Sequence, residues 1–203
     1  MVVYNKNTSL EKIRGMLSAQ NGILRSADLE QNGIPRIYLS ILVKDSKLRR
    51  ISRGVYAAIN ILVDEMVIIQ ARFKNANFSH GTALYLLDLT DRTPLTYTVT
   101  VPSGYNATSL KADGVRVFFV KRELRELGAI TLSSPYGNNI QTYNPERTIC
   151  DILRNRNQLD IQIVNEALKR YATRKDRDIH QLYQYASQFR IEKIVRNNIE
   201  ILL

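Results

Sequence analysis

The segment 33–56, GIPRIYLSILVKDSKLRRISRGVY, constrains the fold of this chain more than any other. Pro35 suits the opening of a helix, because its ring fixes φ near the helical value and its missing N–H needs no partner in the first turn. Leu39 and Leu42, with Val43 beside them, give this helix an apolar face. The segment therefore begins with a short amphipathic helix.

Two strands are predicted after this helix, at 48–51 and 55–58, with Ser52-Arg53-Gly54 as the tight connection between them. Before it, apolar residues at helical spacing over 10–17 predict a first helix, and a second, of about two turns, ends before Gly33. Three helices followed by a basic hairpin are typical of a winged helix-turn-helix, whose leading partner is double-stranded DNA.

The charge of the chain is concentrated in this region. Of its 203 residues, 29 are lysine or arginine and 19 are acidic, a formal net charge of +10, which favours a polyanionic partner. Residues 1–60 hold ten of these cations and four of the acids, a net charge of +6. The composition changes there, so we expect a DNA-binding domain over 1–60 and a second domain over 61–203 that begins with an apolar helix.

The second domain alternates between strand and helix patterns, which predicts a mixed α/β or α+β fold. Asn144-Pro145-Glu146 is a strong helix start. Strands are predicted near 77–78 and within 95–101, 115–120, 130–133 and 139–143, and helices within 80–89, from 145, and over 159–171, 179–189 and 191–203.

A helix in the major groove needs side chains that reach base edges, with cations beside it that hold phosphates. The third helix offers Arg36, Tyr38, Ser40 and Lys44 for this role, and the hairpin offers Lys47, Arg49, Arg50 and Arg53. The alternative for the hairpin is a solvated basic turn with no partner. The preceding three-helix pattern makes DNA the better interpretation.

A second basic run comprises Lys169, Arg170, Arg174, Lys175 and Arg177. It lies at a predicted helix end, where cations stabilise the helix, so a structural role is the first interpretation. Contact with RNA or a partner is the alternative.

Residues that could carry catalysis are few. Ser79, His80 and Asp88 are triad residue types, but the chain has no nucleophile elbow, phosphate-binding glycine loop or H-E-x-x-H pair. Asp45-Ser46-Lys47 is better explained as turn chemistry than as part of a nuclease site. Cys150 is the sole cysteine and is expected to be a small buried hydrophobe. We expect no enzymatic activity, no cofactor and no metal.

The apolar runs are too short to span a bilayer, and the first residues lack the order of a signal peptide. We expect a soluble cytoplasmic protein that does not engage a membrane.

The segment GILRSADLEQNGIPRIYLSILVKDSKLRRISRGVY resembles the N-terminal winged-helix domain of the AbiEi antitoxins, and FSHGTALYLLDL, YTVTVPSGY and NPERTICDIL resemble blocks of the C-terminal domain of that family. One departure is Asp45-Ser46, where a glycine is expected before the wing. The resemblance implies a bifunctional antitoxin of a type IV toxin–antitoxin system linked to abortive phage infection. Its N-terminal domain would bind inverted repeats in its own promoter and repress the operon. Its C-terminal domain would counter a nucleotidyltransferase toxin without forming a stable complex. The alternatives are a DNA-targeted nuclease or hydrolase and a ligand-responsive transcription factor.

Overall fold

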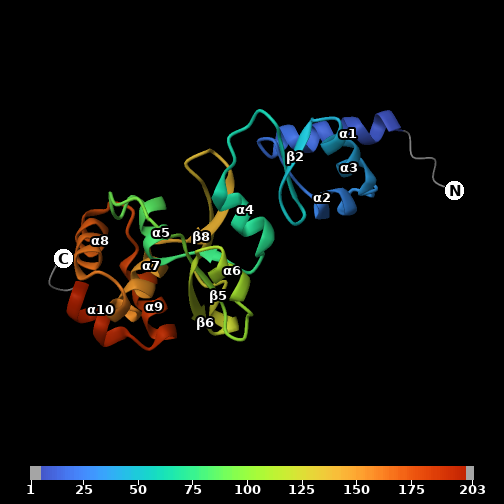
Figure 1. Cartoon of the computed structure of the whole chain (residues 1–203). Helices are drawn as coiled ribbons and strands as arrows, with labels where there is room; N and C mark the ends of the chain where they lie inside the picture. Colours follow the sequence, from blue (N-terminus) through green and yellow to red (C-terminus); the bar gives the residue numbers. More distant parts are fainter. Residues whose placement is uncertain (1–5, 200–203) are drawn as a thin grey trace. The chain divides into compact units, whose positions relative to one another are not determined.

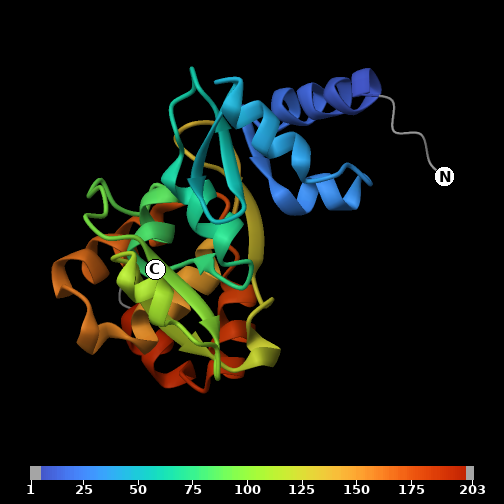
Figure 2. The same ribbon diagram turned by 45° about the vertical axis from the view of Figure 1, so that its right-hand side comes forward.

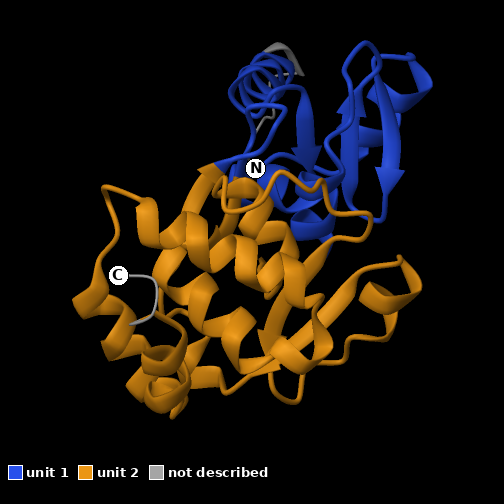
Figure 3. Cartoon of the chain, turned by 90° about the vertical axis from the view of Figure 1, so that its left-hand side faces the viewer, with its two compact units in different colours: residues 1–74, 133–139 blue, residues 75–132, 140–203 orange. Residues whose placement is uncertain are grey.

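The computed structural model describes residues 6–199 and divides the chain into two compact units (Figure 1). The first unit comprises residues 1–74 and 133–139, and the second comprises residues 75–132 and 140–203 (Figure 3). The chain therefore passes between the units three times. Each unit has its own hydrophobic core, so the two are described in turn.

The first unit begins with the helix α1 (Lys6–Ala19) and the short strand β1 (Ile23–Arg25). Two further helices, α2 (Ser26–Gln31) and α3 (Ile37–Lys44), precede the hairpin of β2 (Leu48–Ser52) and β3 (Val55–Ala58) (Figure 2). The helix α4 (Glu65–Arg72) follows. The three helices and two strands expected over residues 10–58 are thus present, and β1 is an element that the sequence patterns missed.

The three strands form one antiparallel sheet in the order β1-β3-β2. The helices α1, α2 and α3 and the outer strands β1 and β2 contribute to one buried cluster, whose members are Ile13, Leu24, Leu29, Ile34, Tyr38, Leu39, Leu42 and Leu48. Because successive residues of a strand point to opposite faces, Ile23, Val55 and Ala57 lie on the other face of the sheet, where they are also buried. The sheet is therefore covered on both faces.

The helix α4 belongs to the first unit and packs against β2 and β3 through an apolar side that includes buried Met66 and Ile69. Its N-cap Asp64 accepts a hydrogen bond from the backbone N–H of Met66 at 2.9 Å and is itself 1% exposed. The second carboxylate oxygen of Asp64 accepts hydrogen bonds from Ser134 Oγ and, at 3.0 Å, from Asn138 Nδ2. These bonds bring the loop 133–139 into the first unit.

The same loop contacts the end of α1. Asn21 Nδ2 donates to Asn138 Oδ1 at 2.8 Å and to the carbonyl oxygen of Gly137 at 3.3 Å. The first unit thus extends past the boundary expected near residue 60, to Lys74, and it takes in seven residues from much later in the chain. The physical reason is the buried carboxylate of Asp64, because a buried charge needs hydrogen-bond partners and the later loop supplies them.

The second unit carries two small sheets and a set of helices. One sheet has the order β4-β5-β6, with β4 (Asn77–Phe78) antiparallel to β5 (Thr98–Pro102) and β5 parallel to β6 (Arg116–Val120). The other pairs β7 (Ala129–Ser133) with β8 (Asn139–Tyr143). The helices are α5 (His80–Leu86), α6 (Thr108–Ala112), α7 (Pro145–Arg154), α8 (Ile161–Thr173), α9 (Ile179–Phe189) and α10 (Glu192–Ile199).

These elements agree with a mixed helix-and-strand fold, and α6 and the short 3₁₀ segments 122–124 and 156–158 were not predicted. The predicted helix start is confirmed: the side chain of Asn144 caps α7 by accepting a hydrogen bond from the N–H of Arg147 at 2.9 Å. The last predicted helix extends into residues 200–203, which lie outside the described residues.

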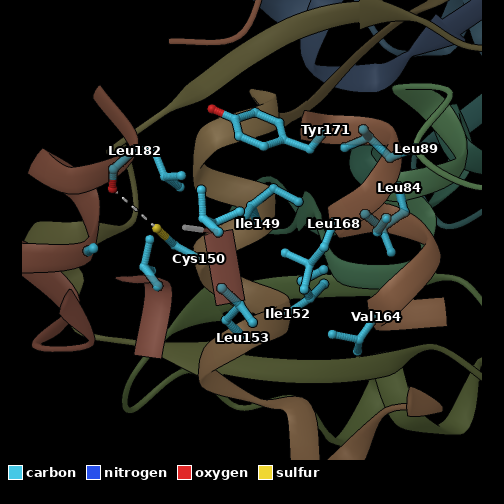
Figure 4. Packing of buried hydrophobic residues seen from close by; sticks show 14 of the residues in the cluster. Leu84, Leu89, Ile149, Cys150, Ile152, Leu153, Val164, Leu168, Tyr171 and Leu182 are labelled. Atoms are coloured by element: carbon cyan, nitrogen blue, oxygen red, sulfur yellow. Dashed lines mark hydrogen bonds between the residues drawn. The ribbon is translucent and has the colours of Figure 1, made fainter. Parts of the chain in front are cut away.

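The helix α7 is the centre of the second core. It packs against α5, α8, α9 and α10, and its side chains Ile149, Cys150, Ile152 and Leu153 are all fully buried (Figure 4). Arg147 on the same helix is also fully buried, with Nε 3.1 Å from Asp151 Oδ2 and Nη1 donating to the carbonyl oxygens of Leu124 and Leu127. The core of the second unit thus contains an ion pair as well as apolar contacts.

Candidate nucleic-acid interface

The helix α3 has a buried face and an exposed face. Leu39 and Leu42 are buried, as expected, and so is Tyr38, which is 8% exposed. The exposed position expected for Tyr38 is therefore wrong. Its aromatic ring belongs to the core cluster because residues 38, 39 and 42 lie on one side of a helix with 3.6 residues per turn. Val43, which was assigned to the apolar face, is 37% exposed.

The exposed face of α3 carries the remaining predicted contact residues. Arg36, Ser40 and Lys44 are all exposed, and their spacing of four residues places them along one side of the helix. Ile37 lies beside them and is 61% exposed. This side combines two cations, a hydroxyl and an aliphatic side chain, which are the groups that can reach phosphates and base edges.

One of these cations has an acidic neighbour. The Arg36 guanidinium pairs with Glu30 of α2, and both side chains are more than half exposed, at 64% and 51%. An exposed ion pair contributes little to stability, about 1 kcal/mol or less, and salt screens it. Phosphate groups can therefore compete with Glu30 for Arg36 at a small cost.

The turn from α3 to β2 contains the departure from the family pattern. Ser46 has a φ of 53°, in the left-handed region that favours glycine. The N–H of Lys47 donates to the carbonyl oxygen of Leu42 at 2.9 Å, and Lys47 Nζ lies 4.0 Å from Asp45 Oδ2. Asp45-Ser46-Lys47 is thus a helix-terminating turn, as the sequence predicted. A serine occupies the position that a glycine would fill without strain.

The hairpin β2–β3 turns at Arg53-Gly54, because Ser52 pairs directly with Val55. Gly54 takes a φ of 76°, and its carbonyl oxygen accepts a hydrogen bond from the N–H of Ser26 at 2.8 Å. The tip of the hairpin is therefore fixed to the first residue of α2. Arg53 is exposed at this tip.

The other two hairpin arginines are exposed but lie on opposite faces of β2. Arg50 pairs in register with Tyr56, whereas Arg49 pairs with Ala57. Arg49 Nη2 donates to the carbonyl oxygen of Ile61 at 3.0 Å, and Arg50 Nε donates to the carbonyl oxygen of Ser52 at 3.4 Å. The sequence analysis grouped Arg49, Arg50 and Arg53 in one binding surface. In the structure, Arg49 and Arg50 point to opposite faces of the hairpin.

One acidic residue of this region, Asp28, has a structural role. Asp28 receives Arg25 Nε at 3.1 Å and the N–H of Arg25 at 3.1 Å, and it is 7% exposed. Lys44 and Arg53, by contrast, take part in no ion pair among the described residues. The exposed face of α3 and the hairpin thus remain positively charged. We name this set of cations the basic face; its members are Arg36, Lys44, Lys47, Arg49, Arg50 and Arg53.

The candidate catalytic residues of the second unit are placed for packing. His80 is fully buried, stacks on Phe118 with 3.5 Å between ring centroids, and has a φ of 47°. Burial lowers the pKa of His80 to about 4, so the ring is neutral at pH 7. The ring nitrogen Nε2 of His80 accepts a hydrogen bond from Asn155 Nδ2 at 3.0 Å, and the other ring nitrogen, Nδ1, lies 3.0 Å from Ser79 Oγ. Asp88 lies beyond the opposite end of α5, so the three residue types do not form a triad.

Two further predictions for the second unit concern Cys150 and metal ligands. Cys150 is fully buried, its Sγ lies 3.7 Å from the carbonyl oxygen of Leu182 (Figure 4), and burial raises the pKa of its thiol far above the usual range. It is the small buried hydrophobe that the sequence predicted. Within residues 6–199, no group of three or more histidine, cysteine or carboxylate side chains is placed to hold a metal ion. No helix in the same range is long and apolar enough to cross a membrane.

The second basic run is partly used within its own unit. Arg170 pairs with Asp91 and, at 3.0 Å, with Glu166, while Arg174 pairs with Asp176 at 2.8 Å and donates to the carbonyl oxygen of Leu87 at 2.8 Å. Arg177 Nη1 donates to the carbonyl oxygen of Arg174 at 2.7 Å. These contacts agree with the structural interpretation.

The chain is similar to a known structure and, over one segment, to a known protein family. The fold resembles the crystal structure of the RV2827C protein from Mycobacterium tuberculosis, with a TM-score of 0.62 and 14% sequence identity over 95% of this chain and 76% of that chain. At this identity the similarity concerns the fold alone. No curated protein sequence matches the chain.

One protein family matches at the sequence level, and the match covers residues 16–59. This range runs from the last turn of α1 to the end of the hairpin, and it contains the whole basic face. The family is described as "Transcriptional regulator, AbiEi antitoxin". Residues 16–59 of this chain are therefore similar to the AbiEi antitoxin family of transcriptional regulators, in agreement with the sequence resemblance over this segment.

Proposed function

We propose that this protein is a transcriptional autorepressor and antitoxin in which the first unit is a winged helix-turn-helix that binds double-stranded DNA. In this proposal α3 is the reading helix and the β2–β3 hairpin is the wing. The observation that carries it is the coincidence of two independent results. The segment that matches a regulator family also carries the basic face, and four of its exposed cations, Lys44, Arg49, Arg50 and Arg53, form no ion pair among the described residues.

The DNA target is proposed to be inverted repeats in the protein's own promoter. The base edges and the flanking phosphates would be contacted by Arg36, Ser40 and Lys44. The phosphate backbone of the DNA would be bound by Lys47, Arg49, Arg50 and Arg53. Binding there would repress the operon. The proposal leaves Tyr38 out, because its ring lies in the core cluster.

The experiment that tests this proposal measures affinity for the promoter duplex by fluorescence anisotropy at several salt concentrations. Replacing Arg50 and Arg53 by alanine should weaken binding and make the slope of log K against log[salt] shallower by about 0.9 per lost phosphate contact. The matched control replaces Lys175 and Arg177, two exposed cations of the second unit, and should leave both quantities unchanged. Equal effects of the two double variants would contradict the assignment of the basic face.

The second part of the proposal is that the remainder of the protein counters a nucleotidyltransferase toxin in the cytoplasm, as part of a type IV system that limits phage infection, without forming a stable complex with that toxin. Its support is the family match together with the resemblance of residues 78–89, 97–105 and 144–153 to blocks of the same family.

This second activity is measured by growth of cells that express the cognate toxin together with each full-length variant. The Arg50→Ala/Arg53→Ala variant should lose repression of a promoter–reporter and keep growth rescue, because a surface change on an exposed hairpin costs little stability. Loss of rescue by this folded variant would show that the antitoxin activity needs the DNA-binding surface.

A further inference from the structure

An aliphatic side chain is exposed beside the cations of the basic face, at the start of α3. Ile37 is the first residue of α3 and is 61% exposed. Leu62, another exposed aliphatic residue of the first unit at 73%, lies in the segment after the hairpin and outside any helix or strand. Ile37 therefore differs from an ordinary exposed hydrophobe in its position, on the surface that the proposed function assigns to DNA.

The helical spacing places Ile37 on the exposed side of α3. Ser40 and Lys44 follow it by three and seven residues, so all three lie on one side of α3, with half-buried Ile41 between them. The opposite side, formed by Tyr38, Leu39 and Leu42, is buried in the core cluster. The side chain of Ile37 is thus unavailable to the core of its own unit.

The chemistry around Ile37 restricts what can cover it. Arg36 precedes it and Lys44 lies on the same side of the helix, so an occupant must be both anionic and locally apolar. Double-stranded DNA meets both conditions, because its phosphates are anionic and the edge of each thymine presents a C5-methyl group in the major groove. The other base edges there offer hydrogen-bond donors and acceptors that an isoleucine cannot satisfy.

We propose that Ile37 is a specificity-determining residue that reads a thymine in each half-site by packing against its C5-methyl group. This inference rests on the proposed function, since it assigns a base to one residue of the same helix. Arg36 and Lys44 then hold the phosphates that flank this base pair, and Ile37 distinguishes thymine from cytosine at a position where neither cation can.

The test replaces each thymine of the promoter repeat, one at a time, by deoxyuridine, which removes only the methyl group. When deoxyuridine replaces one particular thymine of each half-site, the wild-type protein should bind about fourfold more weakly. This is the effect of losing the burial of one methyl group. Ile37→Ala should bind the unmodified duplex more weakly and show no further loss on deoxyuridine substitution at that position. Ile37→Val, which keeps a branched aliphatic group, should retain a measurable loss.

The matched control is Leu62→Ala, which removes an exposed aliphatic side chain of the same unit away from α3. This variant should show the wild-type pattern of deoxyuridine sensitivity. Because Ile37 is mostly exposed, Ile37→Ala should unfold at the wild-type temperature, and its circular dichroism should match that of the wild type.

The outcomes separate the two proposals. A wild-type protein that prefers its promoter to a scrambled duplex, yet loses no affinity at any deoxyuridine, overturns the reading role of Ile37 and leaves the proposed function intact. The same holds if the sensitive thymine remains sensitive in Ile37→Ala. A wild-type protein with no preference for its promoter overturns both.

Discussion

Arginine has opposite roles in the two units: it makes internal contacts in the second unit and is exposed on the first. In the second unit, arginines are used for internal contacts: Arg147 is fully buried with Asp151, Arg170 bridges Asp91 and Glu166, and Arg174 holds a backbone carbonyl. In the first unit Arg36 and the arginines of the hairpin are exposed, and their few contacts are with an exposed acid or with backbone oxygens. Net charge in a sequence therefore does not by itself locate a binding surface. A binding surface is located by the cations that are exposed and make few contacts within the folded protein.

This difference predicts that arginine substitutions cost stability in one unit and DNA affinity in the other. The strongest test is Arg147→Met. Removing the guanidinium leaves the buried Asp151 carboxylate with Arg154 Nη2, 3.9 Å from its Oδ1, as the remaining ion-pair partner among the described residues. Breaking a buried ion pair in this way typically costs about 3–5 kcal/mol of unfolding free energy. Urea denaturation followed by circular dichroism measures it. The double variant Arg147→Met/Asp151→Leu should recover most of the loss, and failure to recover would show that the pair does not explain the effect.

The buried histidine of the second unit supplies the next largest effect, and it depends on pH. Because burial lowers the pKa of His80 from 6.5 to about 4, the unfolded chain binds a proton between these values that the folded chain does not. The free energy of unfolding is therefore highest above pH 6.5 and decreases as the pH falls toward 4, by about 3 kcal/mol in total. The measurement is urea denaturation at several pH values. His80→Gln should show a flatter dependence, and an unchanged slope would exclude His80 as its source.

The turn before the hairpin predicts a smaller effect in the first unit. Ser46 occupies a left-handed conformation at φ 53°, which costs a non-glycine residue about 1–2 kcal/mol. Ser46→Gly should relieve this strain and raise the unfolding free energy by about 0.5–1 kcal/mol after the greater flexibility of glycine in the unfolded chain is counted. Gly54→Ala is the opposite case, because a Cβ at φ 76° would lie 3.0 Å from Ser26 Oγ. It should destabilise the unit, and a neutral result for both changes would contradict the two turn conformations.

The smallest expected effect sharpens the comparison most. Replacing Arg50 or Arg53 by alanine should change the unfolding free energy by less than about 0.5 kcal/mol, since both side chains are exposed and their loss leaves no buried group without a partner. The measurement is the same denaturation curve used for Arg147→Met. A loss comparable to that of Arg147→Met would mean that the hairpin arginines stabilise the fold, and the contrast between the units would no longer hold.

The local patterns predicted most elements because helix starts and strand alternation depend on neighbouring residues. The Asn144-Pro145 pair identified the start of α7, and the strand patterns identified the β2–β3 hairpin. Pro35 was expected to open α3 but lies just before its N-cap Arg36. Tyr38 was misplaced because a tyrosine is compatible with either side of an amphipathic helix, and only the position of the core decides between them.

Features that depend on residues distant in sequence could not be predicted in this way. Nothing near Asp64 shows that its carboxylate is buried and bonded to Ser134 and Asn138, about 70 residues later. Arg147 is a similar case, because a charged residue within a helix is usually exposed. The one available signal was its spacing of four residues from Asp151, which also occurs in exposed helical pairs. The separation of Arg49 from Arg50, by contrast, follows from the predicted strand alone, because successive residues of a strand point to opposite faces.

The loop that completes the first unit has a consequence for synthesis on the ribosome. A chain emerges from its N-terminus, and domains generally fold as their residues become available. When residues 1–74 have emerged, the Asp64 carboxylate still lacks the two side chains that satisfy its second oxygen, because Ser134 and Asn138 are not yet made. The nascent first unit must therefore wait with an incomplete interior while the first half of the second unit is translated. Premature termination between residues 75 and 132 would release a chain that has the entire basic face but lacks Ser134 and Asn138, the partners of the Asp64 carboxylate.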